Sequence, residues 1–389
     1  MAAAFAPPTA PAELPRRLPG VDIVRAVAAL AVVVSHLRRV PDPGLGVPGS
    51  GTWFASVVQQ SLGAWGVGLF FVLSGLCIHL PMARSRALNA AVELPLAPYF
   101  RRRFLRIYPP HLVALILSAL LALALPAWSL VGSALLTKPT WAQFGLHLGM
   151  VHSFVPGAIS SINSVLWTIA VETHFYLLYP LLLIGARRFG FARVTLLLAV
   201  IAIVARSIGL VAPPTFATIV ETNFICRLWE WSLGCCIAER LVAQGAPKST
   251  SGLGFVALCL GSFAMSPVVR LAFRRLLGVE LGRQLGNQLV ALLGPLVFAL
   301  VVLHACGFAH SQRRSFRLLA ALGVESYSLY LCHPLALASW GWLFTTLELP
   351  PLAMFLGAMP VTLMTSWLFF RLVERPFMAR ATPRLAKEV

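Results

Sequence analysis

The sequence predicts an all-α integral membrane protein that crosses the bilayer many times. Of its 389 residues, 58% are hydrophobic and 11% are charged, and the mean hydropathy is +0.82. Because a soluble domain carries about 25% charged residues, we do not expect a soluble enzyme with a single anchor. The apolar residues form continuous runs near 20 residues, the length that a helix needs to cross a bilayer. The strands of a membrane barrel would alternate apolar and polar residues instead.

These runs predict about ten transmembrane helices. We place them at residues 21–40, 61–81, 107–128, 164–185, 191–212, 223–242, 252–270, 286–308, 316–340 and 350–373. Ten such helices use about 200 residues and leave mostly short connections, so we expect one membrane domain over residues 19–376. An Ala/Pro-rich, disordered tail (1–18) precedes it and a short cytoplasmic tail (377–389) follows it.

Arginine residues in the connections predict the orientation. The connection after the second predicted helix holds Arg84, Arg86 and the dense cluster at 101–106, and the positive-inside rule assigns such a connection to the cytoplasm. Both termini are then cytoplasmic. The connection at 270–283 is an exception because its arginines would face outside. Either it is an amphipathic surface segment or one helix is miscounted.

The formal net charge of +18 raises the question of nucleic-acid binding. The basic residues sit in short connections between apolar segments, where they fix topology, so we expect a lipid bilayer and no nucleic acid as partner. The seven cysteines fall almost wholly inside apolar segments without paired spacing. They therefore predict neither a disulfide framework nor a metal site.

Two ionisable residues, Arg25 and His36, lie on the first predicted helix. They are eleven positions apart, close to three turns, so both face one side at a separation of roughly 16 Å along the axis. A charged residue in a membrane helix costs about 2.5 to 3.5 kcal/mol on insertion scales, so the pair predicts a polar path into the membrane. Histidine is the side chain most often used as a general base. The alternative is that His36 lies at the outer interface beside Arg38 and Arg39.

A carboxylate, Glu172, lies in the fourth predicted helix among apolar residues. It is costly there unless it is paired or functional, and it shares a helix face with Tyr176 four positions later. Glu172 and His36, from two different helices, could form a base with its orienting carboxylate. The alternative is a purely structural ion pair, for example with Arg25.

The segment RRRFLRIYPP at 101–110 places four arginines at the cytoplasmic lip of the third predicted helix. Because arginine binds phosphate oxygens in bidentate fashion, this cluster suits a polyanionic cytoplasmic cofactor. The alternative is a topology-setting or lipid-binding basic patch.

Within the second predicted helix, the segment GVGLFFVLSGLCIHL at 66–80 contains Ser74 and several glycines. Small residues let helices or a ligand approach closely, and packing alone remains the alternative. Glu230 in RLWEWSLG and His333 in ESYSLYLCHP add polar groups to the core. For His304 and His310 we expect structural or interfacial roles.

In this order the motifs resemble the membrane-bound acyltransferase family 3, the bacterial O-acyltransferase type that modifies surface polysaccharides. Arg25 and His36 fit its R-x10-H element, and FFVLSG and RRFLRIYP fit its next two motifs. LWTIAVETHFYLLYPLLL looks like its W-S-L-x-V-E-x-x-F-Y segment, and RLWEWSLG, SYSLYLCHP and VERPF complete the series. Each motif is weak alone, but seven in sequence are specific. Thr173 stands where a second glutamate is frequent, and Thr168 replaces the usual serine.

The resemblance implies transfer of an acyl group, acetyl by frequency, from cytoplasmic acyl-CoA to an acceptor hydroxyl without a metal. His36, oriented by Glu172, would act as a general base or as a transient acyl carrier. We expect the cofactor-binding residues to be Arg25, Arg102, Arg103, Arg106 and Tyr108. We expect the substrate-binding residues to be Ser74, Trp167 and Tyr176.

The acceptor stays open between a glycan, a lipid-linked sugar and an exported small molecule. Because the sequence ends soon after the tenth predicted helix, we expect the stand-alone form, without a C-terminal hydrolase-like domain, in the bacterial inner (plasma) membrane. The rival functions are a transporter or flippase of an acylated or anionic molecule and a non-catalytic regulatory membrane protein. The His–Glu combination favours an enzyme, because a transporter needs no base beside a CoA-sized phosphate clamp.

Overall fold

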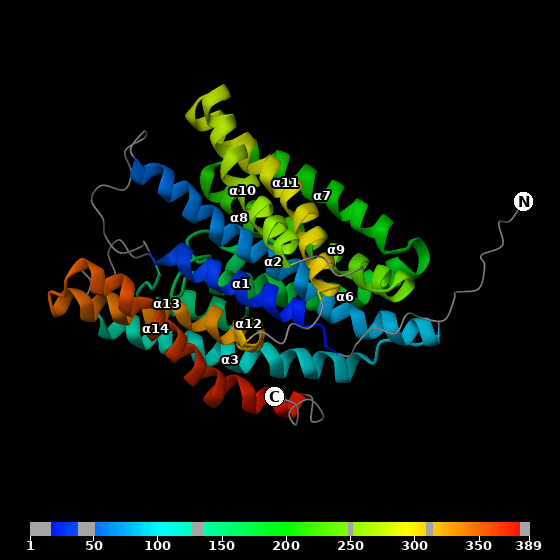
Figure 1. Ribbon diagram of the computed structural model, residues 1–389, viewed down its shortest axis with the longest axis horizontal. Coiled ribbons are helices and arrows are strands. Elements are labelled where there is room, and N and C mark those ends of the chain that lie inside the picture. Colours follow the sequence, from blue (N-terminus) through cyan, green and yellow to red (C-terminus); the bar gives the residue numbers. More distant parts are fainter. Residues whose placement is uncertain are drawn as a thin grey trace, which may run out of the picture.

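The protein is an all-α bundle, which confirms the predicted fold class (Figure 1). The computed structural model describes residues 17–37, 51–89, 91–126, 135–247, 252–308 and 314–381. Within these ranges, eight helices are long and apolar enough to cross a membrane. They make the chain a multi-pass membrane protein.

The helices follow one another in this order. The first half contains α1 (Pro19–His36), α2 (Gly51–Leu88), α3 (Leu96–Ala124), α5 (Trp141–Leu148), the short η1 (His152–Phe154), α6 (Leu166–Phe189) and α7 (Phe191–Val211). The second half contains α8 (Pro214–Thr222), α9 (Phe224–Gln244), α10 (Gly252–Leu277), α11 (Val279–Cys306), α12 (Arg314–Val324), α13 (Ser326–Thr346), α14 (Pro351–Phe369), the π-helix η2 (Phe370–Glu374) and α15 (Arg375–Ala381).

Each of the ten predicted segments falls on a helix, but two of these helices are not apolar enough to count among the eight. They are α9, which carries four charged residues, and α13, which is rich in hydroxyl groups. Both are largely buried in the bundle, where polar side chains can find protein partners instead of lipid. The segment predicted at 316–340 is broken at Glu325 into α12 and α13. The number of ten crossings stays a prediction.

The bundle is held together by close helix contacts at small residues. A Cβ atom on Gly75 of α2 would lie 1.9 Å from the backbone oxygen of Trp231 in α9, and one on Gly234 would lie 2.1 Å from the oxygen of Val72. The two backbones can therefore approach each other only because neither glycine has a side chain. For these glycines, packing explains the small-residue pattern of the second helix.

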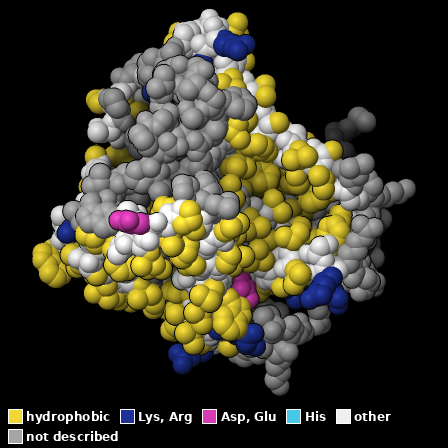
Figure 2. Space-filling model, turned by 60° about the vertical axis from the view of Figure 1, so that its left-hand side comes forward, with side chains coloured by type: hydrophobic (Ala, Val, Ile, Leu, Met, Phe, Trp, Pro, Cys, Tyr) yellow, Lys and Arg dark blue, Asp and Glu magenta, His cyan; other side chains and the backbone are white. Residues whose placement is uncertain are grey.

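The outer surface is apolar over wide areas. Figure 2 shows a face covered mostly by hydrophobic side chains, with the few lysines and arginines in view near its edges. On α7, for example, Leu196, Val200 and Val204 are about half exposed or more. A soluble protein rarely exposes apolar patches of this extent, so lipid is the solvent that fits this surface.

The segment between α3 and α6 packs against both helices. The Tyr108 hydroxyl of α3 donates a hydrogen bond to the Leu148 oxygen at 3.1 Å, and Nε2 of His111 lies 3.2 Å from the oxygen of His147. The stacked rings of His147 and His152, 3.7 Å apart between centroids, connect α5 to η1. Met150 and Ile162 adopt positive φ angles of 57° and 63°, which a β-branched residue such as Ile162 rarely does.

The start of α1 lies at the same end of the bundle as the arginine cluster of α3. Arg25 and Arg106 line a common pocket, and α15 packs against α3. His36 is the last residue of α1 and so lies toward the opposite end. The cytoplasmic assignment of the arginine end stays a prediction. Most of the predicted tails at 1–18 and 377–389 lie outside the described residues, as do Arg38, Arg39 and His310.

Candidate active site

One pocket collects six of the predicted site residues from four helices. Its space is about 860 Å³, part of it open to the outside. The predicted residues that line it are Arg25, Ser74, Arg103, Arg106, Glu172 and Tyr176. The remaining lining residues are mostly apolar or aromatic and include Phe70, Phe71 and Ile169 together with Tyr327 and Tyr330 of α13. The pocket is therefore a mainly apolar chamber with three guanidinium groups.

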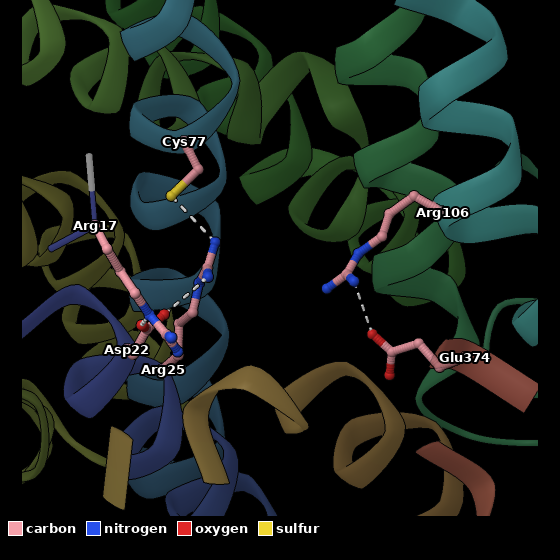
Figure 3. Close-up of polar contacts among 6 residues, drawn as sticks. All are labelled: Arg17, Asp22, Arg25, Cys77, Arg106 and Glu374. Atoms are coloured by element: carbon pink, nitrogen blue, oxygen red, sulfur yellow. Dashed lines mark hydrogen bonds and ion pairs between the residues drawn. The ribbon is translucent and has the colours of Figure 1, made fainter. Parts of the chain in front are cut away.

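Arg25 is fixed on one side of this pocket. Its Nη1 donates a hydrogen bond to Asp22 Oδ1 at 3.3 Å, and its Nη2 donates to the Cys77 sulfur at 3.1 Å (Figure 3). Asp22 also accepts from Arg17 at 3.1 Å. Because a buried carboxylate one turn away compensates its charge, Arg25 can be held at a defined position inside the bundle.

Arg106 comes from the opposite side and has a carboxylate partner that the sequence did not predict. Its Nη1 lies 3.0 Å from Oε1 of Glu374, which is fully buried (Figure 3). The backbone nitrogen and hydroxyl of Ser328 donate to the other carboxylate oxygen of Glu374. Glu374 ends the π-helix η2, and π-helical turns are frequent at functional sites. The signal in the sequence was the VERPF motif, to which we had assigned no role.

Glu172 is hydrogen-bonded to two hydroxyl groups at the pocket wall. The hydroxyls of Ser74 and Tyr176 both donate to Glu172 Oε1, Ser74 at 2.6 Å. The Trp231 indole nitrogen donates to Ser74 at 3.2 Å, and the Arg103 guanidinium lies 5.8 Å from the centre of the Tyr176 ring. Since each hydroxyl has one proton and gives it to Glu172, neither is left to donate to a ligand in this arrangement.

His36 is paired with a second histidine rather than with Glu172. Its Nδ1 lies 3.1 Å from Nε2 of His333 and 2.9 Å from the oxygen of Val32. The predicted orientation of His36 by Glu172 is therefore not what the structure contains. The two side chains lie at different depths in the bundle. Glu172 is next to Ser74 and lines the pocket together with Arg25, and Arg25 is three turns of α1 before His36.

The hydrogen bonds around His333 determine the tautomers of both rings. Nδ1 of His333 lies 3.2 Å from the oxygen of Leu329, and because a carbonyl only accepts, this nitrogen carries the proton. In a neutral ring Nε2 of His333 then accepts, so Nδ1 of His36 must be the donor. The bond from His36 to Val32 requires the same proton on Nδ1. In neutral His36 the unprotonated nitrogen is consequently Nε2, as a general base requires.

His36 does not line the pocket, but a short chain of rings connects the two. Tyr330 lines the pocket, and its ring packs edge-on against His333 at 5.9 Å between centroids. The rings of His333 and His36 are 5.0 Å apart. His36 thus lies behind Tyr330 and His333 at the far end of the chamber.

Three other predicted residues do not line the pocket. Arg102 is one position from Arg103 and therefore points about 100° away from it around α3. Tyr108 binds Leu148 and stacks on Phe104, which is exposed. Trp167 packs against the apolar core. A run of arginines in the sequence cannot show which members share a helix face with the ligand, and the structure selects Arg103 and Arg106.

Thr168 and Thr173, the two threonines that depart from the family pattern, have different surroundings. Thr168 lines the pocket, and its hydroxyl donates to Tyr330 at 2.8 Å. Thr173 instead bonds to the Ile169 oxygen and faces the sulfur of Met150. The position where a second glutamate is frequent therefore points to the α5–η1 segment and not into the pocket. Among the described residues, no group of three or more His, Cys, Asp or Glu side chains is placed to hold a metal ion.

Comparison with known proteins agrees with this arrangement. The family model described as an acyltransferase domain matches residues 18–371, nearly the whole chain. The chain belongs to the acyltransferase 3 family. All residues placed in the pocket lie within the matched range. No solved structure matches the chain.

Several curated proteins resemble parts of the chain. Acyltransferase MdmB of Streptomyces mycarofaciens is 29% identical over 42% of this chain and 39% of its own length. Nodulation protein 10 of Rhizobium leguminosarum is 31% identical over 42% and 43% of the two chains. O-acetyltransferase OatA of Staphylococcus aureus is 23% identical over 82% of this chain and 50% of its own. The matches thus span half or less of each relative.

Proposed function

We propose that this protein is a membrane-embedded O-acyltransferase that moves an acetyl group from acetyl-CoA to a hydroxyl of an exported or cell-surface acceptor. The observation that carries the proposal is the pocket in which Arg25, Arg103 and Arg106 converge on an apolar chamber. Membership of the acyltransferase 3 family and the similarity to OatA, which is named an O-acetyltransferase, support it.

The donor would bind with its phosphates at the mouth formed by Arg103 and Arg106. Arginine forks match phosphate oxygens, and Glu374 holds Arg106 without neutralising Arg103. The thin, mainly apolar pantetheine arm would then run between Phe70 and Tyr327 into the chamber. This arrangement places the thioester deep in the membrane domain, between the phosphate mouth and His36.

His36 would act as the general base on the acceptor hydroxyl. The hydroxyl proton passes to Nε2 of His36 while the oxygen forms a bond to the thioester carbon. The C–S bond then breaks, and the CoA thiolate leaves and takes up the proton. Arg25 lies three turns of α1, roughly 16 Å along the axis, from His36, and its guanidinium group is bonded to Asp22 and Cys77, so it would contact the donor in the pocket and not the oxyanion that forms beside His36. Glu172 would hold Ser74 and Tyr176 in the pocket wall. It would not position His36.

The acceptor would approach from the His36 end of the bundle, opposite the arginine mouth. With the arginine end in the cytoplasm of a bacterial cell and the domain in its plasma membrane, donor and acceptor come from different sides. The acceptor class, proposed from the resemblance, is a glycan, a lipid-linked sugar or an exported small molecule. Its reacting group is a hydroxyl, as the name O-acetyltransferase says of OatA.

Donor binding tests the proposal with a matched pair of variants. Arg103 lines the pocket and Arg102, its neighbour, does not. With purified protein in detergent and labelled acetyl-CoA, we expect Arg103→Gln to weaken binding about tenfold or more and to reduce its salt dependence, since one charge-assisted bond is worth about 1.5 to 3 kcal/mol. Arg102→Gln should bind like the parent. Equal binding by all three proteins would mean that the arginine cluster sets the topology and does not bind the donor.

A further inference from the structure

A second set of arginines lies outside the pocket, around Arg206 of α7. The inward face of α7 is formed by Thr195, Ala202 and Arg206, all buried, whereas the opposite face is exposed apolar surface. Arg206 is 4% exposed. A charged side chain buried in a membrane-spanning helix is expensive and marks a functional site by default.

Within the part of the chain that the structure describes, Arg206 has no bonded counter-ion. Two of its guanidinium nitrogens, Nε and Nη2, are buried without a hydrogen-bond partner. The buried carboxylate of the region, Glu230 of α9, is already paired through Oε1 with Arg227 at 2.8 Å. Its Oε2 has no hydrogen-bond partner either. The Arg206 charge is thus buried without the bonds that normally compensate it.

The arginines around this point outnumber the carboxylates. Arg227 and Glu221 lie close enough to both Arg206 and Arg270 of α10 for their charges to interact. The three arginines Arg206, Arg227 and Arg270 face the two carboxylates Glu221 and Glu230, which leaves an excess of one positive charge. The Nε of Arg270 is also buried without a partner.

The set belongs to the His36 end of the bundle and not to the donor pocket. None of its residues lines that pocket. Arg270 donates to Ser61 near the beginning of α2 at 3.4 Å, and a Cβ atom on Gly63, half a turn later, would lie 2.7 Å from the Ser35 hydroxyl beside His36. α9 is fixed against α7 where the Cys226 sulfur approaches the Ala202 oxygen at 4.0 Å, one turn from Arg206.

We propose that Arg206 and Arg227, with Arg270 adding its charge beside Arg227, form a binding site for a single phosphate group at the end of the bundle opposite the donor mouth. Unpaired guanidinium nitrogens are the donors that phosphate oxygens match best. One bound phosphate would supply the missing negative charge. Because α7 faces lipid on its other side, the phosphate of a membrane lipid is the first source to test, and free phosphate is the second. The site would also give a function to Arg270, whose side of the membrane contradicted the positive-inside pattern.

The test measures the unfolding temperature of the full chain in maltoside micelles while phosphatidic acid is added. Phosphatidylcholine, which has no net charge, serves as the lipid control, and inorganic phosphate is the soluble arm. The variants are Arg206→Gln and Arg270→Gln, with Arg193→Gln as the matched control because Arg193 is exposed on the same helix. A ligand that binds only the folded state raises the unfolding temperature in a concentration-dependent way.

We expect phosphatidic acid to stabilise the parent and the Arg193→Gln protein at the same concentration. Arg206→Gln should need about tenfold more, since the lost charge-assisted bond is worth at least about 1.4 kcal/mol, and Arg270→Gln should also need more than the parent, because it removes a positive charge beside Arg227. If inorganic phosphate gives the same shift, the site takes phosphate from solution; if only phosphatidic acid does, the source is lipid. Equal responses of parent and Arg206→Gln, or equal shifts with phosphatidylcholine, would overturn the proposal. Should Arg206→Gln not fold, Arg270→Gln alone decides it.

Discussion

Nε2 of His333 lies 3.1 Å from Nδ1 of His36, so the histidine of the first helix is held by a histidine from α13. His333 is fully buried and anchored by the backbone of Leu329. It therefore occupies the place of the carboxylate that is the usual partner of a catalytic histidine. A neutral partner fixes the tautomer of His36 but does not stabilise its protonated form by charge.

Replacing His333 should reduce turnover without weakening donor binding. In His333→Phe, which retains an aromatic ring, the Nδ1 proton of His36 loses one of its two acceptors and keeps only the Val32 oxygen. We expect kcat to fall about 10- to 100-fold, part of the 10²–10⁴ that a positioned general base contributes. The KM for acetyl-CoA should change little, and the acidic limb of the pH–rate profile should move. A purely structural role would lower the amount of folded protein but leave that limb in place.

Replacing Glu374 should weaken the binding of the acyl donor and should not change the general base, His36. Glu374→Gln removes the charge that holds Arg106, so we expect a higher KM for acetyl-CoA and a lower unfolding temperature. Breaking one partner of a buried ion pair typically costs about 3 to 5 kcal/mol of stability. The control is Glu93→Gln, because the Glu93–Arg187 pair at 3.4 Å is exposed and such pairs contribute about 0 to 1 kcal/mol. Similar effects of the two variants on KM would show that Glu374 does not position Arg106.

Much of the site could be predicted from the sequence, because motif residues on helices of known period define which faces point inward. Arg25, Ser74 and Glu172 were placed in one polar region in this way, and the pocket contains all three. The depth at which residues of different helices meet could not be predicted. Glu172 was therefore matched with His36, although it lies beside Ser74.

Two further features needed three-dimensional information. Neighbours in an arginine run differ by about 100° around the helix, so only the packing of α3 separates Arg103 from Arg102. Glu374 ends a π-helical turn, and a local change of helical period cannot be read from a pattern that assumes 3.6 residues per turn. The fold class was easier to predict, because long apolar runs indicate membrane helices without any information on which helices pack together.

The contact between α2 and α9 should be intolerant of any side chain. In Gly75→Ala the new methyl group would lie 1.9 Å from the Trp231 oxygen, which is backbone and cannot rotate away. We expect a markedly lower unfolding temperature and a loss of folded protein. Gly145→Ala is the control, since a Cβ there meets nothing within 4 Å and alanine favours helix by about 1 kcal/mol. An unfolding temperature of Gly75→Ala equal to that of the control would contradict the close crossing.

The stacked histidines His147 and His152 should make stability depend on pH. Burial lowers the pKa of His147, and burial together with the charges of His147 and His111 lowers the pKa of His152 to about 2. An unfolded chain takes up these protons near pH 6.5, so the unfolded state binds more protons below that pH. The stabilising contribution is complete above about pH 6.5 and is lost as the pH falls.

The measurement is the unfolding temperature of the parent and of His152→Phe between pH 7.5 and 5.5. The parent should lose more stability over this range than the variant, because phenylalanine can stack on His147 but cannot titrate. If both proteins lose the same amount, His152 is not one of the groups responsible for acid destabilisation.

We propose that His36 activates an acceptor hydroxyl for attack on the thioester of a CoA molecule whose phosphates are held by Arg103 and Arg106. The most direct measurement is transfer of labelled acetyl from acetyl-CoA to a hydroxyl acceptor by purified parent, His36→Ala and His304→Ala proteins. His304 is a half-buried residue of α11 that lies outside the pocket. We expect His36→Ala to bind acetyl-CoA normally but to lose at least about 10²-fold in transfer, and His304→Ala to retain the parent rate. Undiminished transfer by His36→Ala would contradict this proposal.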